Sequence, residues 1–354
     1  MKIIEETLRR ITQTDSSAAA EAQDRLDNLT KPRQSLGKLE DFAKKIAGIT
    51  GTIRPLLANK LIVTMAGDHG VAQEGVSLFP QAVTEQMVYN FLNGGAGINV
   101  LAGHIGARMV VVDMGVAARM TTDSKKIIDK KIAFGTKNMA VGAAMSADEA
   151  IKSIAAGIEV FYEEKRKGRI DIVGVGEMGI GNTTPASAII SCITGASVEE
   201  VTGKGTGISD EQLETKVGVI KKALKINNPD PKDPLDVLKK VGGFEIGGLA
   251  GLVLAAGAEK VPVVLDGFIT ASAAIIATEI APLSKGYLFA SHNSVEKGHV
   301  VALQRMGLEP MFDLKMRLGE GTGACLAISM IEAGVKILTE MATFEDAGVS
   351  REKK

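Results

Sequence analysis

The sequence predicts an α/β protein with a doubly wound, largely parallel sheet and a small helical domain built from the N- and C-terminal segments. Three observations favour this fold. Five short aliphatic or β-branched stretches have the composition of buried strands. Helical patterns separate most of them, and a polar, glycine-bearing loop follows each one. This alternation is typical of a parallel sheet that is covered by helices on both faces.

The five predicted strands are continuous apolar runs rather than alternating ones, as expected for strands that are buried on both faces. In chain order they are KLIVTMA (60–66), RMVVVDM (108–114), RIDIVGV (169–175), VPVVLD (261–266) and GYLFAS (286–291).

One predicted helix has a clear beginning at Ser209. Ser209 and Gln212 form an S-x-x-Q capping box, in which each side chain hydrogen-bonds the backbone N–H of the other residue. Apolar residues then recur at helical spacing on one face: Leu213, Val217, Ile220 and Leu224. The segment 227–234, which contains three prolines, predicts the loop that follows.

We expect residues 51–324 to form a large α/β catalytic domain, and residues 1–50 with 325–354 to form the small helical domain. The first 15 residues have the apolar spacing of an amphipathic helix and lack the uncharged core of a signal peptide. The longest glycine-and-apolar run, 246–258, is only about 13 residues and too short to cross a bilayer. These features predict a cytoplasmic protein without a membrane partner.

Composition argues against several classes of function. A net charge of −1 gives no support to nucleic-acid binding, which needs a basic face. Two cysteines, Cys192 and Cys325, both in apolar surroundings, do not predict a disulfide framework. The four histidines form no H-x-x-x-H or Cys/His motif, and no acidic pair has a spacing suited to Mg²⁺. We therefore expect no metal and no cofactor.

The loops that follow the strands predict the position of a site. In open α/β sheets, ligands bind beyond the carboxyl ends of the strands. One of these loops, GVGEMGIG, contains G-x-G-x-x-G at Gly174, Gly176 and Gly179, as a dinucleotide fingerprint does. However, no clear strand leads to an acidic residue about 20 positions later. In addition, Glu177 occupies the turn that phosphates would approach.

A second interpretation of this loop is a phosphate cradle of backbone N–H groups at the start of a helix. Asn182 and Thr183 in GNTTP offer further hydrogen bonds, and the proline suits a first helical turn. GKGTGISDEQ, from Gly203, is another glycine-rich loop before a helix. Lys216 in that helix is either a solvated edge residue or a phosphate contact, and the sequence alone favours the solvated edge.

Two glutamates, Glu177 and Glu320, stand in glycine-rich segments where ligand loops are expected. Each could lie at a helix N-terminus, where the macrodipole stabilises a carboxylate. Finding both in predicted ligand loops favours general acid–base chemistry. Asp113 and Asp266 each end a predicted strand, and each could cap the following turn or face a ligand hydroxyl.

Several motifs together resemble those of the nicotinate-nucleotide:dimethylbenzimidazole phosphoribosyltransferase family. They occur in order from Lys31 to Glu332 and are SLGKLE, AGDHGVAQEGVSLFPQAVTEQMV, GEMGIGNTTPASAI, LDGF, SHNS and RLGEGTGA. The resemblance implies a doubly wound large domain with a small helical domain from both chain ends, assembled as a homodimer. It implies transfer of 5-phosphoribosyl from nicotinate mononucleotide to 5,6-dimethylbenzimidazole, a step of cobalamin lower-ligand assembly that inverts C1′.

The resemblance also implies roles for individual residues. Glu320 matches the general base, and Glu177 matches a second glutamate near the ribose and nicotinate. The implied substrate-binding residues are Gly179, Gly181 and Lys216 for the 5′-phosphate, Gly176, Asn182 and Thr183 in the same GEMGIGNTT block, Asp266 for a ribose hydroxyl, Gly267 and Ser291 in the matching LDGF and SHNS motifs, Gly319 and Gly321 beside the ring, and Phe79 and Gln86 lining the base.

The sequence departs from the family pattern at two places, and two alternative functions remain open. Gln34 stands where the resemblance leads us to expect glycine, and the base-binding loop, SLFPQAVTEQM, is one that differs among members of the family. The acceptor is therefore a benzimidazole, a phenolic or adenine. The alternative functions are a non-catalytic nucleotide-binding module and an NAD-dependent oxidoreductase. The two intact glutamates argue against the non-catalytic module.

Overall fold

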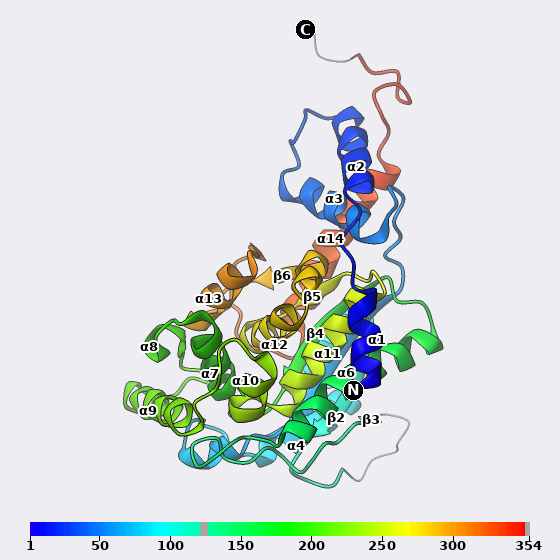
Figure 1. The fold of residues 1–354 in the computed structure, drawn as a ribbon. Coiled ribbons are helices and arrows are strands. Elements are labelled where there is room, and N and C mark those ends of the chain that lie inside the picture. Colours follow the sequence, from blue (N-terminus) through cyan, green and yellow to red (C-terminus); the bar gives the residue numbers. More distant parts are fainter. Residues whose placement is uncertain (121–126, 351–354) are drawn as a thin grey trace.

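The computed structural model describes residues 1–120 and 127–350, and its central feature is a parallel sheet (Figure 1). The strands of these residues are β1 (Lys60–Gly67), β2 (Arg108–Gly115), β3 (Ile128–Asp129), β4 (Ile172–Met178), β5 (Val263–Leu265), β6 (Leu288–His292) and β7 (Pro310–Phe312). They are arranged in the order β3-β2-β1-β4-β5-β6-β7, and every neighbouring pair is parallel. The predicted fold class is confirmed.

All five predicted strands are present, and β1 is buried along nearly its whole length between β2 and β4. The strand order reverses between β1 and β4, so that the loops after these two strands diverge and leave a crevice. The edge strands β3 and β7 were not predicted, because they contain two and three residues and are only partly buried.

Helices cover both faces of the sheet (Figure 1). On one face α11 (Phe244–Ala258) contacts β1, β2, β4 and β5, with α6 (Ala147–Lys167) and α12 (Phe268–Ile280) beside it. On the other face lie α5 (Gly97–His104) and α14 (Thr322–Glu340). Further helices around the sheet are α4 (Ala82–Leu92), α7 (Thr183–Thr194), α8 (Val198–Val201), α9 (Asp210–Asn227), α10 (Pro234–Val241) and α13 (Lys297–Met306).

The predicted capping box at the start of α9 is confirmed. The Ser209 hydroxyl accepts the Gln212 N–H at 3.2 Å, and the Gln212 side chain accepts the Ser209 N–H at 3.0 Å. The helix ends at Asn227, the first residue of the segment 227–234 that was predicted as a loop. Its buried face includes Lys216 as well as apolar residues, so the helix places a cation inside the protein.

Glycines allow α6 and α11 to pack backbone against backbone. A Cβ on Gly157 of α6 would lie 1.8 Å from the carbonyl oxygen of Gly248 in α11. A Cβ on Gly251 would lie 2.0 Å from the carbonyl oxygen of Ile154. Real Cβ atoms do not approach backbone oxygens so closely, which explains part of the high glycine content.

A separate helical cluster lies at the top of Figure 1 and contains α2 (Ser16–Asn28), α3 (Lys38–Thr50) and the end of α14. Its apolar core consists of Ala22, Leu26, Leu29, Ala43, Ala47 and Leu338. The Arg25 guanidinium donates to the Leu338 carbonyl oxygen at 2.7 Å and so joins the two chain ends. Gln34, in the loop between α2 and α3, has a φ of 59°, the left-handed region in which glycine is favoured.

The division into a small and a large domain stays a prediction, but the contacts of α1 (Lys2–Arg10) differ from the expected ones. This helix packs against α6 and α11 of the large domain rather than against α2 and α3. An amphipathic helix packs its apolar face on the nearest apolar surface, which here is α11. The last four residues of the predicted small domain lie outside the described part of the chain.

Among the described residues, α14 is long and apolar enough to span a bilayer by length and composition alone. More than half of its most apolar 18-residue window is buried against the rest of the protein. Its contacts with α3, β4, β5 and β6 are those of a core helix that connects the sheet to the small helical cluster.

The close contact between α6 and α11 predicts that Gly157→Ala destabilises the protein. The added methyl group must push two helix backbones apart, a cost of about 1–3 kcal/mol. Gly218→Ala is the matched control, because Gly218 lies on the exposed face of α9 and an added Cβ meets nothing within 4 Å. The free energy of unfolding of Gly218→Ala should rise by up to about 1 kcal/mol, because alanine restricts the unfolded chain. Urea unfolding of both variants measures the difference, and equal midpoints would contradict the prediction.

Candidate active site

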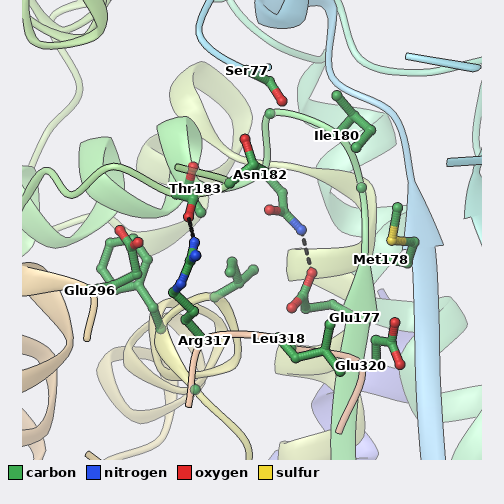
Figure 2. A pocket seen from close by; sticks show the side chains of 18 of the residues that line it. Ser77, Glu177, Met178, Ile180, Asn182, Thr183, Glu296, Arg317, Leu318 and Glu320 are labelled. Atoms are coloured by element: carbon green, nitrogen blue, oxygen red, sulfur yellow. Dashed lines mark hydrogen bonds between the residues drawn. The ribbon is translucent and has the colours of Figure 1, made fainter. Parts of the chain in front are cut away.

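The loops at the carboxyl ends of β1, β4, β5 and β6, together with the segment before α14, enclose a cavity of about 660 Å³ (Figure 2). Its size is that of a small-molecule site. Most of its surface is apolar, and its lining residues are Val76, Ser77, Phe79, Val83, Met87, Glu177, Met178, Gly179, Ile180, Gly181, Asn182, Thr183, Gly205, Thr206, Gly267, Phe268, Ile269, His292, Ser294, Glu296, Arg317, Leu318, Gly319 and Glu320.

The segment Gly319–Glu320–Gly321 has a left-handed backbone at all three residues, with φ values of 85°, 66° and 105°. Glycine adopts this conformation freely, whereas glutamate does so at a cost that the surroundings must offset. The Thr64 hydroxyl of β1 donates to the Glu320 carbonyl oxygen at 2.8 Å. Gly176 of β4 packs against the same peptide, since a Cβ there would lie 2.0 Å from that oxygen.

A buried carboxylate at the end of β5 also fixes this loop. Asp266 accepts the N–H groups of Gly321 at 3.0 Å, Gly323 at 2.6 Å and Ala324 at 3.2 Å. The last two belong to the first turn of α14, so Asp266 caps that helix. Burial raises the pKa of Asp266 to about 7, although the three N–H groups favour its ionised form.

The Glu320 side chain points to the N-terminus of α5. Its carboxylate accepts the Ile98 N–H at 3.2 Å, where the helix dipole stabilises negative charge. Burial raises the pKa of Glu320 above its ordinary range, and the Ile98 N–H opposes this shift. Glu320 is only 4% exposed, and it lines the cavity.

Glu177 lies at the end of β4, on the same side of the cavity as Glu320 (Figure 2). Its carboxylate accepts a hydrogen bond from the Asn182 side chain. Burial, and then the negative charges of Asp266 and Glu245, raise the pKa of Glu177 to about 8. A Cβ on Gly319 would lie 2.6 Å from Glu177 Oε1, so the glycine before Glu320 leaves room for the second carboxylate.

Cationic and hydroxyl groups gather on the other side of the cavity. Thr183, the first residue of α7, lines the cavity, and its hydroxyl accepts a hydrogen bond from Lys216 Nζ at 2.7 Å. Lys216 is fully buried behind Thr183, and burial lowers its pKa to about 8. The solvated position that the sequence alone favoured for Lys216 is therefore wrong. Arg317 lines the cavity and donates to the Gly205 carbonyl oxygen at 3.3 Å.

The three glycines of G-x-G-x-x-G serve packing inside the protein. A Cβ on Gly174 would lie 2.7 Å from the Ile62 side chain, and one on Gly179 would lie 2.2 Å from the Gly67 carbonyl oxygen. Gly176, as described above, meets the Glu320 peptide. These close contacts account for the motif without a bound dinucleotide.

Nine of the expected site residues line the cavity. They are Phe79, Glu177, Gly179, Gly181, Asn182, Thr183, Gly267, Gly319 and Glu320. Their roles toward a substrate stay predictions.

Six expected residues are not part of the cavity lining. Gly176, Gly321 and Lys216 lie directly behind it. Asp266 was expected to meet a ribose hydroxyl, but its oxygens accept backbone N–H groups, so its other interpretation, a turn cap, is favoured. The Ser291 hydroxyl donates to the Asp266 carbonyl oxygen at 2.5 Å. Gln86 is exposed on α4, whereas Val83 and Met87 of the same helix line the cavity.

Several lining residues were not predicted as site residues. Arg317, Leu318 and Thr206 belong to motifs that the sequence marked, RLGEGTGA and GKGTG, so their position in those motifs was the available signal. Glu296 had no such signal, because it stands outside the glycine-rich segments. Within residues 1–120 and 127–350, no group of three or more His, Cys, Asp or Glu side chains could hold a metal ion.

Comparison with known proteins agrees with this geometry. A family model described as "Phosphoribosyltransferase" matches residues 11–349. The chain is 56% identical to the nicotinate-nucleotide–dimethylbenzimidazole phosphoribosyltransferase of Geobacter metallireducens over 99% of both chains. It is 55% identical to the enzyme of the same name from Desulforudis audaxviator, over 100% of this chain and 99% of the relative.

A solved structure of the enzyme of that name from Thermus thermophilus superposes with a TM-score of 0.90. It is 41% identical, and the match covers 96% of this chain and 100% of the other. With a family model along most of its length and relatives above half identity, this chain belongs to the nicotinate-nucleotide–dimethylbenzimidazole phosphoribosyltransferase family.

Proposed function

We propose that this protein transfers 5-phosphoribosyl from nicotinate mononucleotide to 5,6-dimethylbenzimidazole or a related base. The products are α-ribazole 5′-phosphate and nicotinate, for use in cobalamin lower-ligand assembly. The observation that carries this proposal is the pair of buried carboxylates, Glu177 and Glu320, in one largely apolar cavity with a cationic far side. The names of the relatives support the same reaction.

In this reaction Glu320 is the general base. One benzimidazole nitrogen attacks C1′ of the ribose, and the other nitrogen carries a proton that must leave. Because burial raises the pKa of Glu320, it is a stronger base than an exposed glutamate. Removing the proton keeps positive charge from accumulating on the ring. Direct displacement of nicotinate from the opposite face inverts the configuration at C1′.

Glu177 interacts with the positive charge of the sugar donor. Nicotinate mononucleotide contains a pyridinium cation, and charge moves onto the ribose as the glycosidic bond breaks. A carboxylate beside these centres stabilises them, as in other sugar transfers. Burial raises the pKa of Glu177 to about 8, and an adjacent cation favours its ionised form.

The far side of the cavity suits the 5′-phosphate. The N-terminus of α7 supplies N–H groups and a favourable dipole, and Thr183 supplies a hydroxyl. Lys216 and Arg317 add positive charge. The apolar wall of Val83, Met87 and Leu318, with Phe79 at the rim, suits a flat base. Nicotinate leaves with a neutral pyridine ring and keeps its carboxylate, so this scheme needs no metal.

The alternative functions have less support. A dinucleotide site would need the G-x-G-x-x-G glycines to face phosphates, whereas Gly174 and Gly176 are enclosed by internal contacts. A non-catalytic module would have no need for two buried carboxylates with raised pKa values. The proposal includes a cytoplasmic homodimer. The homodimer rests on the family resemblance, and the location rests on the N-terminal sequence and the length of the apolar runs.

Incubation of the purified protein with nicotinate mononucleotide and 5,6-dimethylbenzimidazole, without added metal, tests the proposal. We expect a ribazole phosphate and an equal amount of nicotinate, detected by HPLC and mass spectrometry. NADH titration is the counter-experiment. Saturable binding of NADH in the absence of any transfer product would favour an oxidoreductase instead.

The position of Glu320 predicts that Glu320→Gln lowers turnover by about 10²–10⁴-fold, the usual contribution of general acid–base catalysis. The amide cannot accept the proton, yet it can still accept the Ile98 N–H, so substrate affinity should change less. Glu309→Gln removes the same charge from an exposed position and should retain activity. Steady-state kinetics measures both, and unchanged turnover in Glu320→Gln would remove Glu320 from the role of base.

The raised pKa of Glu177 predicts a bell-shaped dependence of kcat/KM on pH, with a maximum near pH 8. Glu177 is ionised only as the pH rises through about 8, whereas Lys216 loses its charge as the pH rises through about 8. Glu177→Gln should lose the acid limb near pH 8, retain the alkaline limb and have a lower kcat/KM overall. If Glu177→Gln kept the acid limb of the pH profile, that limb would belong to another group, such as Asp266, and the prediction would be wrong.

A further inference from the structure

Glu296 is a buried carboxylate on the side of the cavity where cations gather (Figure 2). It occupies the N-cap position of α13, but its side chain makes no capping hydrogen bond to that helix. Its Oε2 atom has no hydrogen-bond partner among the described residues. Burying a carboxylate in this way is unfavourable unless the charge has a function or a partner.

The neighbours of Glu296 are the groups that suit a phosphate. The Gly205 backbone N–H, Lys216 and Arg317 all interact favourably with the ionised Glu296 carboxylate. A Cβ on Gly203 would lie 2.1 Å from Glu296 Oε2, so the glycine-rich loop packs directly on the carboxylate. The Glu296 carboxylate therefore lies among the N–H groups and cations that would otherwise bind an anionic ligand.

The negative charge of Glu296 is unfavourable for phosphate binding on this side of the cavity. A phosphate monoester carries a charge of about −1.5 to −2 at neutral pH. Lys216 and Arg317 would compensate for this charge, but Glu296 cancels part of their field. Burial raises the pKa of Glu296, while Lys216, the Gly205 N–H and Arg317 oppose this shift and favour its ionised form.

We propose that Glu296 is a counter-charge that limits the affinity of the cavity for the 5′-phosphate. This inference rests on the proposed function, in which the donor nucleotide and the ribazole product carry the same phosphate. Tight phosphate binding would stabilise substrate and product alike without accelerating the chemical step, and it would slow product release. A carboxylate that weakens this interaction allows the product to leave.

Titration with inorganic phosphate tests the counter-charge directly and requires no turnover. Glu296→Gln keeps the shape of the side chain and removes its charge, so phosphate should bind about tenfold more tightly. Glu296→Asp keeps the charge and should bind phosphate as the unaltered protein does. Glu214→Gln is the matched control, because it removes one negative charge from the exposed face of α9. Calorimetry gives the affinities, and thermal unfolding shows whether each variant is folded.

Weaker or unchanged phosphate binding by a folded Glu296→Gln variant would overturn the inference, because Glu296 would then support Lys216 or contact the sugar. Turnover provides a second readout. In Glu296→Gln both KM for nicotinate mononucleotide and kcat should fall, with a burst of product in the first turnover. Tighter phosphate binding without any transfer activity in the unaltered protein would support the counter-charge and contradict the proposed reaction.

Discussion

The carboxylate of Asp266 is the interaction on which the rest of the site depends. It stands at the end of β5 and accepts three backbone N–H groups, one from Gly321 and two from the first turn of α14. Without it, the left-handed backbone of Gly319–Glu320–Gly321 would have fewer bonds to offset its strain. Thr64 and Gly176 fix the opposite side of the same peptide. Three strands and a helix therefore determine where the Glu320 carboxylate lies.

The site concentrates carboxyl groups whose ionised forms are disfavoured by burial. Glu177, Asp266 and Glu320 are all buried, and their mutual repulsion adds to the effect of burial on the pKa of Glu177 and Asp266. Such a cluster is unfavourable for the stability of the fold, and it attracts a cation. A donor with a pyridinium ring is such a cation, so its binding would relieve part of this unfavourable energy.

Much of the fold was predictable because its signals are local. Five strands lie in continuous apolar runs, and the α9 capping box is defined within four residues. The positions of Asp266, Lys216 and Gln86 were not predictable from the residues alone, since each depends on partners distant in the sequence. The sequence around Lys216 predicts a solvated side chain, because its partner Thr183 belongs to another helix and is 33 residues earlier in the chain. Glu296 likewise depends on the glycine loop at Gly203 and Gly205, roughly 90 residues earlier.

Helix α14 begins at Thr322, one residue after the left-handed segment, and ends at Glu340 among the helices of the small cluster. Its length is about 28 Å at the usual rise per residue. At its far end it packs on α3, where a Cβ on Gly334 would lie 2.4 Å from the Leu39 carbonyl oxygen. Because α14 is one continuous helix that is packed at both ends, a displacement of one end also displaces the other. A tilt of α14 imposed at the small cluster would therefore move the peptide that carries Glu320, even though no residue of that cluster lines the cavity.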